Sequence, residues 1–409
     1  MIEVLAVRTF RRLFSAQVVA LLGTGSLTVA LGLVAFDLAG AHAGAVLGTA
    51  LTIKMLAYVV GAPVMAALVD RLPKKPVLVA ADLVRGGIAL MLPAVDQAWQ
   101  IYVLVFVLQS ASATFTPAFQ SLIPAVLPDE RQYTRALSLS RLAYDLESLI
   151  SPALAAALLS VLTFHELFLG TVAGFMFSAA LVVTTSLPAP PAARKEGSLW
   201  RRTTLGARIF AQTPELRGLL ALNLAVAAAT ALVLVNTVVY ARDLFAGSNA
   251  DVAVALACFG AGSMAAALSA PRALDRMADR SLMMAGAALL GLGLAGTFVL
   301  LAAAGPWLVL LVLWVALGAG TSMIGTPSAR LLRRSATEST RTYIFTAQFS
   351  LSHACFIITY PVAGWIGASA GQPAAAAVLA AVAMISTAAA LKFWPAASRT
   401  GSEPASRKG

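Results

Sequence analysis

The sequence is a succession of long apolar stretches separated by short polar segments. A helix that crosses the roughly 30 Å hydrocarbon core of a bilayer needs about 20 mostly apolar residues, because each residue adds about 1.5 Å. Twelve segments meet this requirement, approximately residues 13–36, 45–69, 77–95, 101–126, 142–162, 167–187, 219–239, 252–270, 282–303, 308–323, 343–366 and 374–393. The pattern therefore predicts an all-α membrane protein with twelve transmembrane helices.

The composition supports this prediction and excludes several classes of function. Hydrophobic residues make up 59% of the chain and charged residues 11%, whereas soluble domains carry about 25% charged residues. Cys258 and Cys355 both lie inside apolar stretches, so no disulfide framework is indicated. The sequence contains neither a phosphate-binding Gly-x-x-x-x-Gly-Lys stretch nor a His-Glu-x-x-His stretch. We therefore expect a protein that is not an enzyme, hydrolyses no ATP and holds no cofactor.

The basic residues predict how the chain is oriented in the membrane. Of the 29 Lys and Arg residues, all except Lys54, Arg85 and Arg242 fall in segments on one side of the predicted helices. Basic residues near helix ends resist translocation, so both termini are expected in the cytoplasm, with the chain in a bacterial inner membrane. The net charge of +11 then reflects topology, and no nucleic-acid partner is expected. The first apolar segment is too long for a signal peptide's core, so we expect it to be retained.

The chain divides into two similar halves. Residues 188–217 are rich in proline and basic residues and predict a cytoplasmic linker between two six-helix bundles, residues 1–187 and 218–393. A disordered cytoplasmic tail is expected over residues 394–409. Asp70-Arg71 after the second apolar segment recurs as Asp275-Arg276 after the eighth. Repeated halves of this kind are one of the arrangements on which transporters build alternating access.

Several stretches resemble the major facilitator superfamily. Its signature Gly-x-Leu-Ala-Asp-Arg-x-Gly-Arg-Arg is matched by residues 66–75, AALVDRLPKK, where the charged positions are kept and both glycines are replaced. Residues 114–124, TFTPAFQSLIP, resemble the drug and siderophore exporter branch, including enterobactin exporters, with some likeness to nickel-resistance exporters. In the helix-5 signature of exporters, Gly-x-x-x-Gly-Pro-x-x-Gly-Gly, Pro152 is kept and Glu147 replaces the first glycine.

The resemblance implies a secondary active transporter that exports a drug-like or siderophore-like small molecule from the cytoplasm by proton antiport with alternating access. Export of a divalent metal such as nickel is an alternative. A membrane sensor that keeps the transporter fold without moving a substrate is an alternative of another class. The expected partners are membrane lipid, a small-molecule substrate and protons, and the chain is expected to be a monomer.

Charged residues within the apolar segments are candidates for function, because each costs about 2.5–3.5 kcal/mol to place at a membrane helix centre. Glu147 is the leading candidate for proton coupling, since apolar surroundings disfavour its charged form. Asp145 and Lys54 are further candidates, and a buried ion pair is the alternative. A charge latch on the cytoplasmic side is expected from the acidic and basic residues that follow the second and eighth segments or begin the third: Asp70, Arg71, Lys74, Lys75, Asp82, Arg85, Asp275 and Arg276.

Polar residues at helical spacing mark a candidate substrate cavity. The resemblance implies that helices 1, 4, 7 and 10 line it, and each carries a polar stripe. The candidates are Gln17, Thr24, Thr28, Gln109, Ser112, Thr116, Gln120, Asn223, Thr230, Thr237, Trp314 and Thr321. Such residues either face water or hydrogen-bond between helices, and both alternatives remain open at each position.

A metal site is only weakly indicated. His353, Cys355 and Cys258 are the candidate ligands, because imidazole and thiolate suit nickel or zinc. Their spacing matches no strong metal motif, and a lone buried cysteine usually behaves as a small apolar residue. We therefore expect no resident metal.

Overall fold

The computed structural model describes residues 2–61, 73–129, 162–186, 199–337 and 340–395, together with single positions between 132 and 159. Within these ranges every secondary-structure element is helical. Ten helical stretches of the described chain are long and apolar enough to cross a membrane, and the first of them, Arg8–Val59, contains two of the predicted segments. The prediction of an all-α membrane protein is confirmed. The predicted segment at residues 142–162 lies largely outside the described residues, as does the tail after residue 395.

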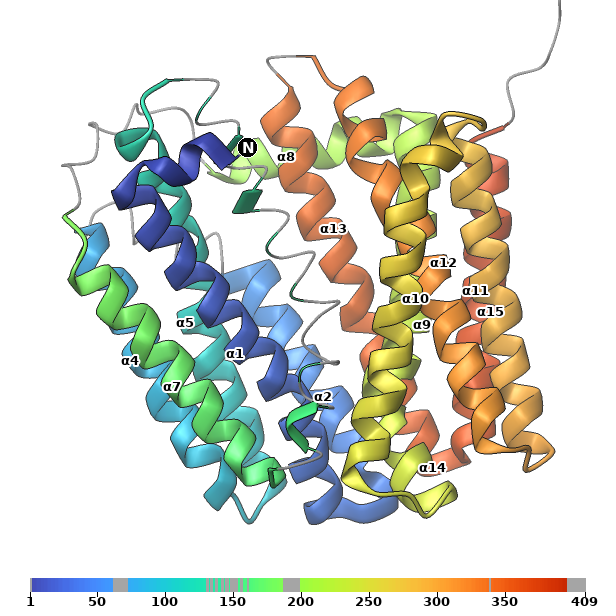
Figure 1. Ribbon diagram of the computed structural model, residues 1–409. Coiled ribbons are helices and arrows are strands. Elements are labelled where there is room, and N and C mark those ends of the chain that lie inside the picture. Colours follow the sequence, from blue (N-terminus) through green and yellow to red (C-terminus); the bar gives the residue numbers. More distant parts are fainter. Residues whose placement is uncertain are drawn as a thin grey trace, which may run out of the picture.

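The helices form two groups that stand side by side (Figure 1). The first group consists of α1 (Arg8–Ala39), α2 (Ala43–Leu56), continued by the π-helical turn η3 (Ala57–Gly61), α4 (Lys74–Met91), α5 (Ala98–Val126) and α7 (Phe164–Val183). Helix α1 packs on α7, and α4 packs on both α5 and α7.

The second group consists of α9 (Pro214–Val239), α10 (Asn249–Leu274), α11 (Asp279–Ala302), α12 (Trp307–Arg334), α13 (Arg341–Pro361) and α15 (Gln372–Phe393). The short elements η1 (Ile2–Ala6), η2 (Gly40–His42), η4 (Leu92–Ala94), η5 (Tyr240–Leu244), η6 (Val362–Ile366) and α14 (Gly367–Ala370) lie at helix ends. Helix α10 packs closely on α12, and α15 packs on α9 and α11.

Local sequence signals explain where the helices turn back. Helix α10 begins with a capping box, because the Ser248 hydroxyl accepts the Asp251 backbone N–H while the Asp251 carboxylate accepts the Ser248 N–H. Helix α15 begins after Gly371, whose φ of 91° favours a residue without Cβ. Such caps satisfy backbone groups that neither the helix nor the lipid can satisfy.

Helix α8 (Leu199–Gln212) lies within the predicted linker and crosses the end of the second group against α13 (Figure 1). A Cβ on Gly206 would overlap the carbonyl oxygen of Tyr343, so the two backbones touch at this point. Below, the end of both groups at which α8 lies and α9 begins is called the linker side, and the opposite end the far side.

The described contacts between the two groups begin at the far side, where α2 crosses η6 and α13. A Cβ on Gly364 would overlap the carbonyl oxygen of Gly44, and one on Gly48 would lie 2.7 Å from the carbonyl oxygen of Tyr360. Beside this crossing, Trp365 Nε1 donates a hydrogen bond of 3.1 Å to Thr49 Oγ1. Small residues allow membrane helices to approach this closely, so the two groups are joined backbone to backbone.

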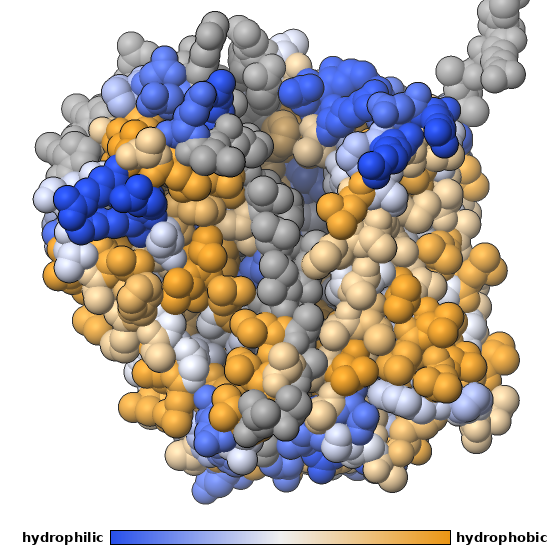
Figure 2. All heavy atoms as spheres, in the orientation of Figure 1, coloured by the Kyte–Doolittle hydropathy of each residue, from blue (hydrophilic) through white to orange (hydrophobic). Residues whose placement is uncertain are grey.

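The surface has the distribution expected for a bilayer solvent. On the face that Figure 2 shows, hydrophobic side chains form a broad band across both groups, and hydrophilic side chains gather toward the two ends. Large apolar side chains of the long helices are exposed, for example Leu292 of α11 and Leu308 of α12, each to 71%. A soluble monomer would not leave such an area uncovered.

Candidate functional site

A buried ion pair lies inside the first group. Arg85 donates a hydrogen bond through Nη2 to Asp82 one turn earlier on α4, and both residues are buried. Ser178 of α7 completes the arrangement, since its hydroxyl donates a 2.7 Å hydrogen bond to the second carboxylate oxygen of Asp82. The spacing of Asp82 and Arg85 predicts their pairing, whereas Ser178 is a single hydroxyl in an apolar segment and carries no sequence signal of its role.

Two aromatic rings hold the guanidinium of Arg85. Its central carbon lies 4.5 Å from the centroid of the Phe115 ring on α5 and 4.6 Å from that of the Phe175 ring on α7. Cations are attracted to ring faces at such distances, and more strongly where water is excluded. The charge of Arg85 is thus compensated by a carboxylate and two rings from three helices.

Arg85 also faces a small cavity of about 30 Å³ between α1, η3, α4 and α5. Three of the predicted cavity residues, Gln17, Thr24 and Ser112, line it together with Tyr58 and Phe115. Gln17 is only 2% exposed, and its amide oxygen accepts no hydrogen bond from the described part of the chain. A buried acceptor without a donor costs about 1–3 kcal/mol, so this cavity favours a ligand group or water that donates a hydrogen bond.

Lys54 of α2 and Glu147 are close enough to attract each other electrostatically. Both are predicted coupling residues, and they are 93 positions apart in the chain. The structure thus brings together two of the three coupling candidates. Asp145, the third, lies outside the described residues.

The polar residues of the second group mainly bond to each other or to their own helices. Trp314 Nε1 of α12 donates a 2.9 Å hydrogen bond to Thr237 Oγ1 of α9, and both side chains are buried. Asn223 Nδ2 of α9 donates a 3.1 Å hydrogen bond to Gln348 Oε1 of α13. Thr321 donates to the carbonyl of Gly318 on its own helix. These polar side chains therefore form hydrogen bonds either to a neighbouring helix or within their own helix.

The other cavity candidates are placed as follows. Thr28 is partly buried and donates to the carbonyl oxygen of Thr24, and Thr230 is partly buried. Gln109 is 5% exposed, and its amide oxygen has no hydrogen-bond partner in the described chain. The side chains of Thr116 and Gln120 lie outside the described residues.

The ion pairs at the charged corner between α10 and α11 are formed by Asp279. Asp275 and Arg276 are exposed and form no ion pair within the described residues. Asp279, four residues later and 4% exposed, accepts a 3.0 Å hydrogen bond from Arg334 and lies 3.4 Å from Arg330. The repeat of Asp-Arg does not indicate Asp279, because burial of this residue depends on how α11 meets α12, and a latch role of Asp275 and Arg276 stays a prediction.

The corresponding corner of the first group is described in part. Lys75 Nζ donates a 3.0 Å hydrogen bond to the carbonyl of Thr185, and Lys74 is buried. Asp70 and Arg71 lie outside the described residues. A latch formed by these groups stays a prediction.

The metal-ligand candidates lie on separate elements or faces. The centroid of the His353 ring on α13 lies 4.2 Å from that of Phe349, with the two rings tilted by 33°, and 5.9 Å from that of Tyr58 on η3. Cys355 Sγ donates to the carbonyl of Leu351, and Cys258 is on α10. Within the described residues, no three His, Cys, Asp or Glu side chains are grouped as a metal ion would require.

Comparison with known proteins relates the chain to membrane transporters. A family model described as Major Facilitator Superfamily matches residues 13–246 and 218–409. Macrolide efflux protein A of Streptococcus pyogenes is 26% identical over 184 residues, which are 44% of this chain and 45% of that protein. Multidrug resistance protein MdtG of Enterobacter lignolyticus is 27% identical over 199 residues, 46% of this chain and 47% of that protein. The match thus spans about half the length of these relatives.

Solved structures share the whole architecture. A bacterial homolog of the human lysosomal transporter Spinster superimposes with a TM-score of 0.71 at 10% identity, covering 94% of this chain and 96% of that chain. The nucleoside transporter NupG gives a TM-score of 0.71 at 14% identity, covering 95% of this chain and 100% of that chain. At such identities the likeness shows the fold alone.

Proposed function

The chain belongs to the major facilitator superfamily and is a multi-pass membrane transporter, not an enzyme; on this premise we propose that it exports amphiphilic, drug-like organic molecules from the cytoplasm in exchange for protons. The names of the relatives, a macrolide efflux protein and a multidrug resistance protein, support export of drugs over export of siderophores or metals. Within the described residues, no group of metal-ligating side chains supports nickel as the substrate.

The observation that supports proton coupling is the proximity of Lys54 and Glu147, whose charges are near enough to interact. A carboxylate in an apolar span exists either ionised beside a cation or protonated and neutral. Protonation of Glu147 would remove its attraction for Lys54, so proton binding is proposed to change the electrostatic interaction between Glu147 and Lys54 of α2. A proton taken up from outside would thereby be linked to the position of α2, the helix that joins the two groups.

The substrate path is proposed to open on the linker side. Basic residues gather there on both groups, among them Arg12, Lys75, Arg272 and Arg334, which supports a cytoplasmic linker side and cytoplasmic termini. The contact of Gly48 and Gly364 closes the far side. In the proposed cycle this contact separates when the outward-facing state forms.

Substrate recognition is assigned to the cavity beside Arg85 in its opened form. Gln17 provides an amide oxygen that accepts no hydrogen bond from the described part of the chain, and Ser112 provides a hydroxyl group. Phe115 and Tyr58 provide aromatic surface. Apolar walls with a few polar groups are typical of small-molecule sites. Such a lining suits an amphiphilic molecule that carries hydroxyl or amine donors.

Inside-out vesicles from cells producing the full chain test this proposal. Radiolabelled erythromycin should accumulate in respiring vesicles, and a protonophore should abolish the accumulation. Accumulation that survives the protonophore would contradict proton antiport. Accumulation no greater than in vesicles without the protein would overturn the macrolide-type substrate, and saturable binding without accumulation would favour a sensor that keeps the transporter fold.

A further inference from the structure

A second and larger cavity of the described chain lies away from the interior. It is a groove of about 430 Å³ between α10 and α11 with α12 as its floor. Its lining includes Gly262, Ala266, Ser269 and Ala273 of α10, Leu282 of α11 and Val315 of α12. The volume is within the range of about 300–1,000 Å³ that is usual for small-molecule sites.

Unequal helix packing creates this groove. Helix α10 touches α12 backbone to backbone, since a Cβ on Gly262 would overlap the carbonyl of Val315 and one on Gly318 would overlap the carbonyl of Phe259. By contrast, α10 and α11 contact each other only slightly. The two helices therefore diverge on either side of α12, and Figure 1 shows α12 between them.

The groove opens onto the hydrophobic surface of the protein. Ala265 and Ser269 are exposed, and Val315 is 40% exposed. Ser269 bears the one polar side chain of the lining, and its hydroxyl donates to the carbonyl of Ala266 on its own helix. The wall is thus apolar, and the solvent in front of it is hydrocarbon.

The groove has the length of one leaflet. Between Gly262 and Ala273 the helix rises by about 16 Å at 1.5 Å per residue, and half of the hydrocarbon core measures about 15 Å. Because α10 ends on the linker side, the groove runs from the middle of the membrane to that surface. An acyl chain lying along α10 would occupy it over its full length.

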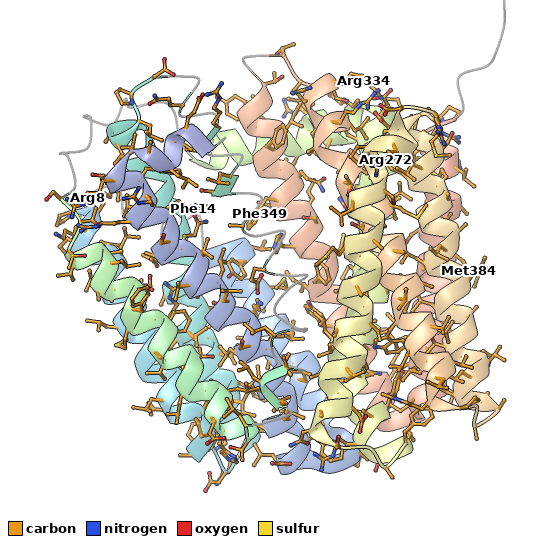
Figure 3. The ribbon with its side chains drawn as sticks, in the orientation of Figure 1. Arg8, Phe14, Arg272, Arg334, Phe349 and Met384 are labelled. Carbon is orange, nitrogen blue, oxygen red and sulfur yellow. The ribbon has the colours of Figure 1, made fainter. Side chains whose placement is uncertain are left out.

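Basic residues stand at the surface end of the groove. Arg272 directly precedes the lining residue Ala273 and is exposed (Figure 3). Arg276, one turn further along the chain, is exposed as well. Neither forms an ion pair within the described part of the chain. Asp275 between them is also exposed, but the buried carboxylate of Asp279 is occupied by Arg330 and Arg334. Basic clusters beside membrane helices attract anionic head groups.

We propose that this groove binds an anionic phospholipid of the leaflet on the linker side, with an acyl chain along α10 and the phosphate at Arg272 and Arg276. The groove is separate from the cavity beside Arg85, because the groove is lined by α10, α11 and α12 and that cavity by α1, η3, α4 and α5. Its occupant fills a gap between α10 and α11 that protein side chains leave open. The bound lipid would therefore support the packing of these two helices.

Photocrosslinking of the full chain in nanodiscs tests the proposal. The probe is phosphatidylglycerol with a diazirine on its acyl chain, compared with the matching phosphatidylcholine probe, and mass spectrometry locates the labelled peptides. We expect labelling of residues 262–273 and 315–323 by phosphatidylglycerol, at several times the level obtained with phosphatidylcholine. Ala266→Trp, which fills the groove, should reduce this labelling several-fold, and Leu292→Trp on the exposed face of α11 should not.

The head-group contact is tested separately. The double variant Arg272→Gln/Arg276→Gln should bring phosphatidylglycerol labelling down to the phosphatidylcholine level, whereas Arg208→Gln on α8 should leave it unchanged. Equal labelling by both probes in the unaltered chain, or labelling that Ala266→Trp does not reduce, would overturn the proposal. Crosslinks between two copies of the chain at the groove would overturn it as well, in favour of a dimer contact.

Discussion

Ser178 of α7 donates a 2.7 Å hydrogen bond to Asp82 of α4, across 96 positions of sequence. The buried carboxylate of Asp82 accepts a second hydrogen bond from Arg85. In a bilayer, water cannot replace a missing donor, so each partner of this carboxylate matters for stability. The first two predictions follow from this arrangement.

Ser178→Ala should lower the free energy of unfolding by about 1–3 kcal/mol, because it leaves one oxygen of the buried Asp82 without its donor. The measurement is the midpoint of thermal unfolding of the purified protein in detergent. Ser110→Ala is the matched control, since the partly exposed Ser110 donates only to the carbonyl of Phe106 on its own helix. Equal midpoints for the two variants would count against the structural role of Ser178.

The Asp82–Arg85 pair should behave as a coupled unit. Arg85→Gln or Asp82→Asn alone should destabilise by about 3–5 kcal/mol, because each leaves a buried charge without its partner. The double variant should be less destabilised than the sum of the two single changes. A double-mutant cycle on thermal unfolding measures the coupling, and additive effects would show that the two charges do not depend on each other.

Much of the fold could be predicted from the sequence, because a bilayer restricts spanning structure to helices that satisfy their own backbone. Apolar segment length therefore carries most of the information, as the long helices α9 and α12 illustrate. The crossing of Gly44 with Gly364 could not be predicted in the same way. The crossing requires two helical segments from different halves to meet at the same depth in the membrane. Because glycines are common in membrane helices, a single glycine does not indicate such a contact.

The candidate site shows the same division. Local spacing was enough to pair Asp82 with Arg85, since residues three apart on a helix are neighbours. It could not decide whether Thr237 faces a cavity or another helix, because both alternatives require the same polar residue. In the structure, Thr237 Oγ1 accepts a hydrogen bond from Trp314 Nε1, which belongs to a different helix. Interactions between residues far apart in the chain, such as that of Lys54 with Glu147, leave no pattern in the sequence around either residue.

Glu147→Gln should abolish gradient-driven transport while leaving substrate binding or exchange intact. The amide keeps the size of the protonated carboxyl group but cannot carry a proton through the cycle. Inside-out vesicles loaded with erythromycin measure both activities: accumulation driven by respiration, and exchange of labelled for unlabelled compound without a gradient. Glu166→Gln is the control, because Glu166 caps α7 at its exposed first turn. Normal driven transport in the Glu147 variant would refute its coupling role.

Gly364→Ala should weaken the closure of the far side, because the new Cβ would overlap the carbonyl of Gly44 and push α2 from η6. In a cysteine-free background, Thr49→Cys should then react several-fold faster with a membrane-impermeant thiol reagent added from the far side. Gly87→Ala is the matched control, since a Cβ added at Gly87 would meet no atom within 4 Å. Equal reaction rates in both backgrounds would show that this crossing does not hold the far side closed.

Asp279 and Asp275 offer a direct comparison within one corner. Asp279→Asn should lower the free energy of unfolding by about 1–2 kcal/mol, because the lost charge weakens its contacts with Arg330 and Arg334, whose exposed side chains are partly screened by solvent. Asp275→Asn removes the same charge four residues earlier and should change it by less than about 0.5 kcal/mol, since an exposed residue away from special contacts contributes little. Thermal unfolding at low and high salt measures both. The Asp279 effect should persist at high salt because that carboxylate is buried, and a larger effect at Asp275 would assign the corner's stability to the repeated Asp-Arg pair instead.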